Sequence, residues 1–164
     1  MCLLLVVEPS YTAGMPVPRL LFVCLGNICR SPTAEGIARA KAAAVGLTVE
    51  VDSAGTSDWH IGAPPDTRMQ AAAAAAGYDL SPLRARQFTP ADFAGFNVIY
   101  AMDRKNLAAI ESQRPAGAET PVRLFRSADP KGGTDVPDPY YEGGFDGVVD
   151  LIERTLDRIL ADLR

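Results

Sequence analysis

The sequence predicts an α/β fold, a three-layer sandwich in which four parallel strands lie between helices on both faces. Short apolar segments alternate along the chain with longer segments that have helical periodicity or are rich in strong helix formers. Strands that alternate with helices imply right-handed crossovers and a parallel sheet covered on both sides. The 164 residues are enough for one such domain and too few for a second.

The first strand and the first helix are the most clearly marked elements. Residues 19–24 are almost wholly apolar and are followed by a turn signal, which is typical of a strand buried on both faces. Ser31 and Pro32 are interpreted as an N-cap followed by proline in the first helical turn. A helix is therefore expected from there to about Val45.

The rest of the chain continues the alternation. Further strands are expected over residues 48–53, 97–102 and 122–125. Further helices are expected from 64–66 through the alanine run that Gly77 ends, from Thr89-Pro90 for a short distance, over 104–112, and over about 145–163. In the last helix six apolar residues form one stripe, Val148, Val149, Ile152, Leu156, Ile159 and Leu160.

Two segments fall outside this alternation. Residues 1–18 are interpreted as an N-terminal extension before a domain at 19–164, with Met15 as an alternative start. The apolar run near the N-terminus is too short for a signal peptide or a membrane span. Residues 127–144 are dense in Asp, Pro and Gly, and a loop of this length is usually either a functional lid or disordered.

Composition excludes several classes of function. The net charge of −4 argues against a broad basic surface for nucleic acid. Three cysteines are an odd number and two of them are five residues apart, so a reducing, cytoplasmic location is favoured over a secreted disulfide framework. The single histidine, His60, is interpreted as a loop residue, and no histidine-rich metal site is expected.

Cys24 and Arg30 are the strongest candidates for chemistry. Cys24 ends the first strand and Arg30 lies where the first helix begins, and backbone N–H groups and the helix dipole favour an anion there. A thiol in such a place ionises readily beside a guanidinium, and arginine can hold two phosphoryl oxygens at once. The spacing alone also fits a buried structural cysteine followed by a surface arginine.

The surrounding residues resemble one family. The segment Val23-Cys-Leu-Gly-Asn-Ile-Cys-Arg-Ser-Pro-Thr-Ala-Glu35 resembles the phosphate-binding loop of low-molecular-weight protein-tyrosine phosphatases nearly letter for letter. The resemblance covers about residues 19–163 and implies a flavodoxin-like fold with strand order 2-1-3-4. It also implies that Cys24 is the nucleophile, Arg30 the phosphate clamp, and the loop around them the phosphate cradle, comprising Leu25, Gly26, Asn27, Ile28, Cys29 and Ser31.

The same resemblance assigns roles outside that loop. Val136-Pro-Asp-Pro-Tyr-Tyr141 resembles the family's general-acid segment, so Asp138 would be the general acid and base, although an Asp-Pro turn has the same sequence. Ser53 would orient Asn27, and Ser31 would donate to the thiolate or simply cap the helix. The walls of an aryl slot would be three aromatic residues that also fit ordinary packing, Trp59, Tyr140 and Tyr141.

The implied function is hydrolysis of phosphotyrosine and small aryl phosphates through a phosphocysteine, with no metal or cofactor. The implied protein is a cytoplasmic monomer with tyrosine-phosphorylated protein substrates and phosphate as product inhibitor, and no membrane or nucleic-acid partner is expected. Phosphoarginine is an alternative substrate, although related arginine phosphatases tend to have threonine in place of Ile28. A non-catalytic phosphate-binding or redox-sensing module, with Cys29 as redox partner of Cys24, is a second alternative that would not need Asp138.

Overall fold

The computed structural model describes residues 16–164 and confirms the predicted α/β fold. Its four strands form one parallel sheet in the predicted order β2-β1-β3-β4. Their bounds are Arg19–Cys24 for β1, Glu50–Gly55 for β2, Val98–Ala101 for β3 and Val122–Leu124 for β4. The proposed start at Met15 and most of the expected N-terminal extension lie outside the described residues.

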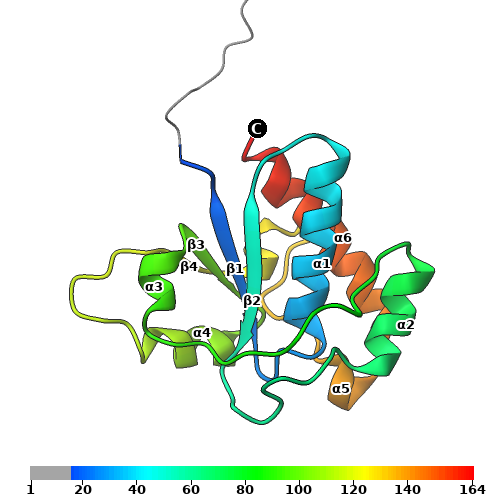
Figure 1. Ribbon diagram of the computed structural model, residues 1–164, viewed down its shortest axis with the longest axis horizontal. Coiled ribbons are helices and arrows are strands. Elements are labelled where there is room, and N and C mark those ends of the chain that lie inside the picture. The colour runs from blue at the N-terminus through cyan, green and yellow to red at the C-terminus, as the bar shows by residue number, and fades with distance from the viewer. Residues whose placement is uncertain (1–15) are drawn as a thin grey trace, which may run out of the picture.

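Helices flank the sheet on both faces (Figure 1). In chain order they are α1 (Arg30–Ala44), α2 (Thr67–Ala75), α3 (Asp92–Gly95), α4 (Arg104–Glu111), the 3-10 helix η1 (Phe125–Ala128), α5 (Pro139–Glu142) and α6 (Phe145–Ala161). α1, α2 and α6 lie on one side of the sheet in the view of Figure 1, and α3 and α4 on the other. No helix within residues 16–164 is long and apolar enough to cross a membrane.

The central strand β1 joins two separate cores. Because successive side chains of a strand point to opposite faces, Leu20 and Phe22 pack in the core under α1 and α6, whereas Leu21 and Val23 pack in the smaller core under α3 and α4. All four side chains are almost fully buried. A strand with this pattern is held from both sides, so the position of Cys24 at its end is well defined.

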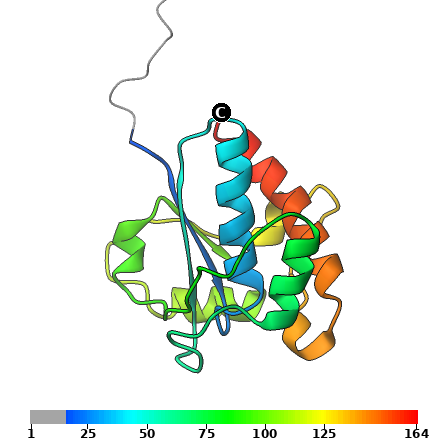
Figure 2. The same cartoon turned by 45° about the vertical axis from the view of Figure 1, so that its right-hand side comes forward.

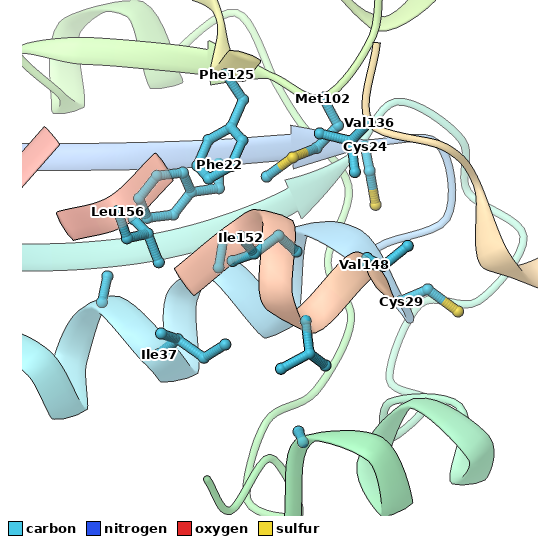
Figure 3. Packing of buried hydrophobic residues seen from close by; sticks show 14 of the residues in the cluster. Phe22, Cys24, Cys29, Ile37, Met102, Phe125, Val136, Val148, Ile152 and Leu156 are labelled. Atoms are coloured by element: carbon cyan, nitrogen blue, oxygen red, sulfur yellow. The ribbon is translucent and has the colours of Figure 1, made fainter. Parts of the chain in front are cut away.

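α1 and α6 lie side by side over the larger core, as Figure 2 also shows. The whole predicted apolar stripe of α6 is buried, and Figure 3 shows Leu156 and Ile152 near Phe22 and Val148 near Cys29. Phe22 stacks edge-on against Phe125 with ring centroids 5.9 Å apart. The packing connects the last helix directly to the strand that ends in Cys24.

One expectation about local structure is corrected, and one open alternative is decided. α1 begins two residues earlier than expected, at Arg30, with Cys29 at the N-cap position and no side-chain cap, so the N-cap role of Ser31 is wrong. The hydroxyl of Ser31 is buried and bonds to neighbours in the preceding loop instead. The long loop at 127–144 contains part of η1 and all of α5, and is a folded segment rather than a disordered one.

Candidate active site

The candidate site is a cleft at the carboxyl end of β1, at the bottom of the molecule in Figure 1, where α1 begins and α5 lies nearby. Ligands of open α/β sheets bind at this edge, where the strand order reverses. The residues that line the cleft are Cys24, Leu25, Gly26, Ile28, Cys29, Arg30, Trp59, His60, Asp138, Tyr140 and Tyr141. The structure thus gathers in one place most of the residues singled out in the sequence, from three separate segments.

The loop from Cys24 to Ser31, called here the phosphate loop, has a tightly constrained backbone. Asn27 has φ 55°, and it is the one non-glycine residue with positive φ among the described residues. A Cβ on Gly55 would lie 2.9 Å from the carbonyl oxygen of Leu25, so only glycine allows the end of β2 to approach the loop this closely. Thr56 N–H donates to the Cys24 carbonyl at 2.9 Å and closes the contact.

The phosphate loop offers several unused N–H groups. Six backbone N–H groups of this loop donate to no protein acceptor within residues 16–164. They belong to Leu25, Gly26, Ile28, Cys29, Arg30 and Ser31. The last two belong to the first turn of α1, where the helix dipole adds positive potential. Such a ring of donors is suited to the oxygens of a tetrahedral anion.

Cys24 begins the phosphate loop and is 3% exposed. Its sulfur accepts a hydrogen bond from Asn27 N–H at 3.3 Å and lies 3.0 Å from Ser31 Oγ. Asn27 Nδ2 donates to Ser31 Oγ at 2.8 Å, so the one hydroxyl proton of Ser31 can point at the sulfur or at the Ala54 carbonyl, which lies 3.4 Å away. The sulfur therefore lies within hydrogen-bond distance of two polar groups of its own loop.

A buried chain of hydrogen bonds supports Asn27 from behind. Asn27 Nδ2 donates to Ser53 Oγ at 2.9 Å, and Ser53 Oγ donates to Glu35 at 2.6 Å. Arg39 in turn donates to Glu35 at 2.8 Å from the next turn of α1. The structure therefore places Ser53 beside Asn27 as expected, and adds Glu35 and Arg39, to which the sequence had assigned no role.

Arg30 is 2% exposed and is held by three acceptors. Nη1 donates to Asp103 at 2.7 Å and to the Val136 carbonyl at 3.0 Å, and Nη2 donates to Asp138 at 3.3 Å. Burial by itself would lower the pKa of Arg30, but the neighbouring Cys24 and the two carboxylates raise it. The guanidinium stays charged and is oriented by Asp103, which the sequence analysis missed.

Asp138 lies at the start of α5, where it caps the helix by accepting from Tyr140 N–H at 3.1 Å. Its segment is tied to the sheet, because Val136 N–H donates to the carbonyl of Met102, just beyond β3, at 2.8 Å. Figure 3 shows Val136 beside Cys24 at the tip of β1. The expected Asp-Pro turn and the expected carboxylate in the cleft are therefore both present.

Aromatic side chains form the outer part of the cleft. Trp59 is 64% exposed, Tyr141 67% and Tyr140 44%, so none of the three serves as core packing. The rings of Tyr140 and Tyr141 meet edge to face at 5.0 Å, and Arg68 lies over the Tyr140 ring at 5.7 Å. Large exposed aromatic surfaces at the rim of a cleft are suited to an aryl group of a ligand.

His60 also lines the cleft, whereas the sequence analysis gave it no role beyond the loop. Its ring centroid lies 6.3 Å from that of Tyr140, and its Cδ2 lies 3.0 Å from where a Cβ on Gly26 would be. His60 follows Trp59 directly, so its position next to an expected wall residue was the available signal.

Cys29 lies at the beginning of α1, is 4% exposed, and is not bonded to Cys24 (Figure 3). Burial, together with the nearby Asp66 and Cys24, raises the pKa of the Cys29 thiol. It is a neutral thiol beside an ionisable one, and its role as redox partner stays a prediction. Residues 16–164 contain no group of three or more His, Cys, Asp and Glu side chains placed to hold a metal ion.

Comparisons with known proteins agree with this geometry. The family model described as low molecular weight phosphotyrosine protein phosphatase matches residues 19–164. A low molecular weight protein-tyrosine-phosphatase of Streptomyces coelicolor is 43% identical over 154 residues, which cover 89% of this chain and 93% of that one. The crystal structure of YfkJ from Bacillus subtilis has a TM-score of 0.85 at 38% identity, covering 92% and 96% of the two chains. The crystal structure of a Drosophila arginine phosphatase has a TM-score of 0.80 at 31% identity, covering 88% and 97%.

Proposed function

This chain belongs to the low molecular weight phosphotyrosine protein phosphatase family, and from that premise we propose that it hydrolyses phosphotyrosine in proteins, and small aryl phosphates, through a phosphocysteine on Cys24. The observation that carries the proposal is the buried Cys24 sulfur at the start of a loop with six unused N–H groups, close enough to Arg30 to raise the pKa of its guanidinium. Phosphate monoesters match this site in charge, and the aromatic rim matches their aryl group.

In the first step the Cys24 thiolate attacks phosphorus in line with the bond to the tyrosine oxygen. The new sulfur–phosphorus bond forms as that oxygen–phosphorus bond breaks, and Asp138 donates its proton to the departing oxygen. Asp138 lines the same cleft as Cys24 and comes from a separate segment of the chain, which supports this assignment. The products of the step are a neutral tyrosine side chain and a phosphocysteine.

In the second step a water molecule attacks the phosphocysteine while Asp138, now ionised, takes one of its protons. The sulfur–phosphorus bond breaks, phosphate leaves, and Cys24 becomes a thiolate again. The Ser31 hydroxyl, 3.0 Å from the sulfur, stabilises the charge that returns to it. Phosphate, as the product, is expected to compete with substrate for the same N–H groups.

Arg30 and the loop N–H groups stabilise the three equatorial oxygens in both steps, which is usually the largest electrostatic contribution in such sites. Asp103 holds Nη1 at 2.7 Å, and the longer contact of Nη2 to Asp138 leaves that edge of the guanidinium available to a phosphoryl oxygen. The fork geometry of arginine allows this double use, which a lysine would not.

Phosphoarginine is the second substrate to be considered, because a Drosophila arginine phosphatase shares the fold. Ile28 and the exposed tyrosines of the rim make the cleft of this chain apolar, which favours an aryl group over a charged guanidino group.

We further propose a monomer acting in the cytoplasm, because an odd number of cysteines suits a reducing compartment.

The test is hydrolysis of p-nitrophenyl phosphate, a phosphotyrosine peptide and a phosphoarginine peptide by reduced protein in excess chelator. Wild type, Cys24→Ser and Cys29→Ser are compared, since Cys29 is a matched control that is also a buried thiol of the same loop. Turnover of the two aryl substrates by wild type and Cys29→Ser, but not by Cys24→Ser, is expected.

Two results would contradict the proposal. Turnover that survives in Cys24→Ser would rule out a phosphocysteine intermediate on Cys24. A preference for the phosphoarginine peptide would show that phosphoarginine, and not phosphotyrosine, is the substrate class. Acid quenching during turnover, followed by mass spectrometry of the peptide that contains Cys24, should detect the added phosphoryl group directly.

A further inference from the structure

The backbone that leads to Asp138 is folded around the side chain of Arg126. This segment, residues 129–138, is called here the acid loop. Arg126 Nη2 donates to the Gly132 carbonyl at 2.6 Å, and Nη1 donates to the Asp135 carbonyl at 3.1 Å. Nε donates to the Asp129 carboxylate at 3.1 Å. One guanidinium thus binds the beginning, the middle and the later part of the acid loop.

The loop backbone passes very close to that guanidinium. Gly133 has φ 112°, and a Cβ built on it would lie 2.4 Å from Arg126 Cζ. Any other residue would clash with the guanidinium and would also be strained in its backbone. The path of the acid loop and the position of Arg126 are therefore fitted to each other.

Arg126 is itself anchored to the core through Asp129. The Asp129 carboxylate is fully buried and also accepts two hydrogen bonds from Arg154 of α6, at 2.9 and 3.0 Å. The Arg154 guanidinium is the main reason that the pKa of Asp129 lies well below its usual range. Arg126, Asp129 and α6 consequently form a rigid base under the acid loop.

The other contacts of the acid loop between Asp129 and Val136 are local or exposed. Two close the turn at Asp129, whose carbonyl accepts from Gly132 N–H at 2.8 Å and whose carboxylate accepts from Lys131 N–H at 2.9 Å. The backbone N–H of Arg104 donates to the Asp135 carboxylate at 3.0 Å. Residues 130–134 are all exposed, so no apolar side chain packs there. Arg104 binds the Asp135 carboxylate from outside the loop, but both side chains of that ion pair are well exposed, and such pairs contribute little. After Val136 the chain is held by Met102 and Arg30, and reaches Asp138 two residues later.

We propose that Arg126 is a positioning residue that sets the place of Asp138 relative to Cys24, and so controls proton transfer to the leaving group. The inference rests on the proposed function, because it concerns the reaction assigned there. The two hydrogen bonds from Arg126 to loop carbonyls hold the exposed part of the acid loop in place. They do not contribute to the packing of the sheet or of its two cores. Removing them frees the loop upstream of Asp138 while Cys24 and its donors remain in place.

This role predicts a kinetic signature that a general loss of stability does not give. The poorer the leaving group, the more the reaction depends on a general acid. A positioned general acid increases the reaction rate about 100- to 10,000-fold. The value of kcat/KM reports steps up to the first transition state. Loss of Arg126 should therefore lower kcat/KM for phenyl phosphate, a poor leaving group, much more than for 2,4-dinitrophenyl phosphate.

The experiment compares wild type, Arg126→Met and Arg154→Met on these two substrates, with Asp138→Asn as the benchmark for complete loss of the acid. Arg154→Met is the matched control, because it also removes an arginine from Asp129 but leaves the bonds to the Gly132 and Asp135 carbonyls. In Arg126→Met the kcat/KM ratio of phenyl to dinitrophenyl phosphate should fall about tenfold, a part of the general-acid contribution. In Arg154→Met the unfolding temperature should fall while the ratio stays at the wild-type value.

An equal fall in kcat/KM for both substrates in Arg126→Met, which leaves their ratio unchanged, would show that Arg126 only supports the fold and would overturn the proposal. Wild-type kcat/KM values for both substrates in that variant would overturn it as well. If Arg126→Met does not fold at the assay temperature, Arg126→Lys decides, because one amine replaces the fork and an intermediate ratio is then expected. Wild type that hydrolyses neither substrate would refute the proposed function, and this inference with it. Active wild type with an unchanged ratio in both Arg126 variants would refute the inference alone.

Discussion

Replacement of Ser31 by alanine removes a hydroxyl that lies 3.0 Å from the Cys24 sulfur, within a helix turn that alanine maintains. Asn27 keeps its bond to Ser53 at 2.9 Å, so the phosphate loop retains its main support. The hydrogen bonds lost with the Ser31 hydroxyl cost about 0.5 to 1.5 kcal/mol each in stability. The variant is therefore expected to fold, with a modest decrease in the free energy of unfolding.

The effect on turnover should be larger, because in the second step the sulfur leaves as an anion. A hydrogen bond to a charged group contributes about 1.5 to 3 kcal/mol. Since 1.36 kcal/mol corresponds to a factor of ten in rate, kcat should fall about 10- to 150-fold. The thiolate that attacks in the first step loses the same stabilisation before the reaction, so kcat/KM should fall less than kcat.

The assay is steady-state hydrolysis of p-nitrophenyl phosphate, with a rapid-mixing measurement of the first turnover. A burst of p-nitrophenol followed by a slow phase is expected, since the phosphocysteine should accumulate. Ser57→Ala is the matched control, because Ser57 Oγ donates to the Leu25 carbonyl of the same loop at 2.9 Å but is not among the partners of the sulfur. An unchanged kcat in Ser31→Ala, or an equal fall in Ser57→Ala, would refute the assignment of Ser31.

Three further predictions concern stability, reactivity and binding. The pKa of Asp129 is lowered from 3.8 to about 2, chiefly by Arg154, so the contribution of Asp129 to stability is present above about pH 4 and is lost as pH falls towards 2. Asp129→Asn should lower the unfolding temperature at pH 7 and make the unfolding temperature less dependent on acid pH. An unchanged dependence on acid pH would argue against the ion pair. Because burial raises the pKa of the Cys29 thiol, iodoacetamide at pH 7 should modify Cys24 before Cys29, and phosphate should protect Cys24. Peptide mapping identifies the modified thiol, and modification of Cys29 first would contradict the raised pKa of that thiol. His60→Ala should raise KM for aryl phosphates about 2- to 12-fold, because an aromatic contact contributes about 0.5 to 1.5 kcal/mol, and His60→Phe should restore it; equal KM values in all three proteins would exclude His60 from the slot.

The fold could be predicted because its signals are local. Apolar runs of strand length and helical stripes such as the one in α6 are visible within windows of ten to fifteen residues, and the structure confirms them. Boundaries were less accurate because they depend on pairing. β2 begins at Glu50 rather than at residue 48, since Arg19, the first residue of β1, pairs with Glu50.

The candidate site was predictable in the part that lies within one short segment. Cys24, Asn27 and Arg30 are close in sequence, and a strand that turns directly into a helix must bring them together. Asp138 was found only through a resemblance, because nothing in its own segment distinguishes a catalytic carboxylate from an Asp-Pro turn. Arg126 gave no signal at all, since its partners in the acid loop are backbone carbonyls.

The sequence by itself determined the elements, the sheet order implied by the family, and the loop that bears the nucleophile. Only the tertiary structure decided which carboxylates meet Arg30, that Glu35 supports Ser53, and that His60 faces the cleft. The physical reason is the distance along the chain. Periodicity and capping are set by neighbours within a turn or two, whereas Asp103 reaches Arg30 across 73 residues only because β3 pairs beside β1 and their carboxyl ends share one edge of the sheet.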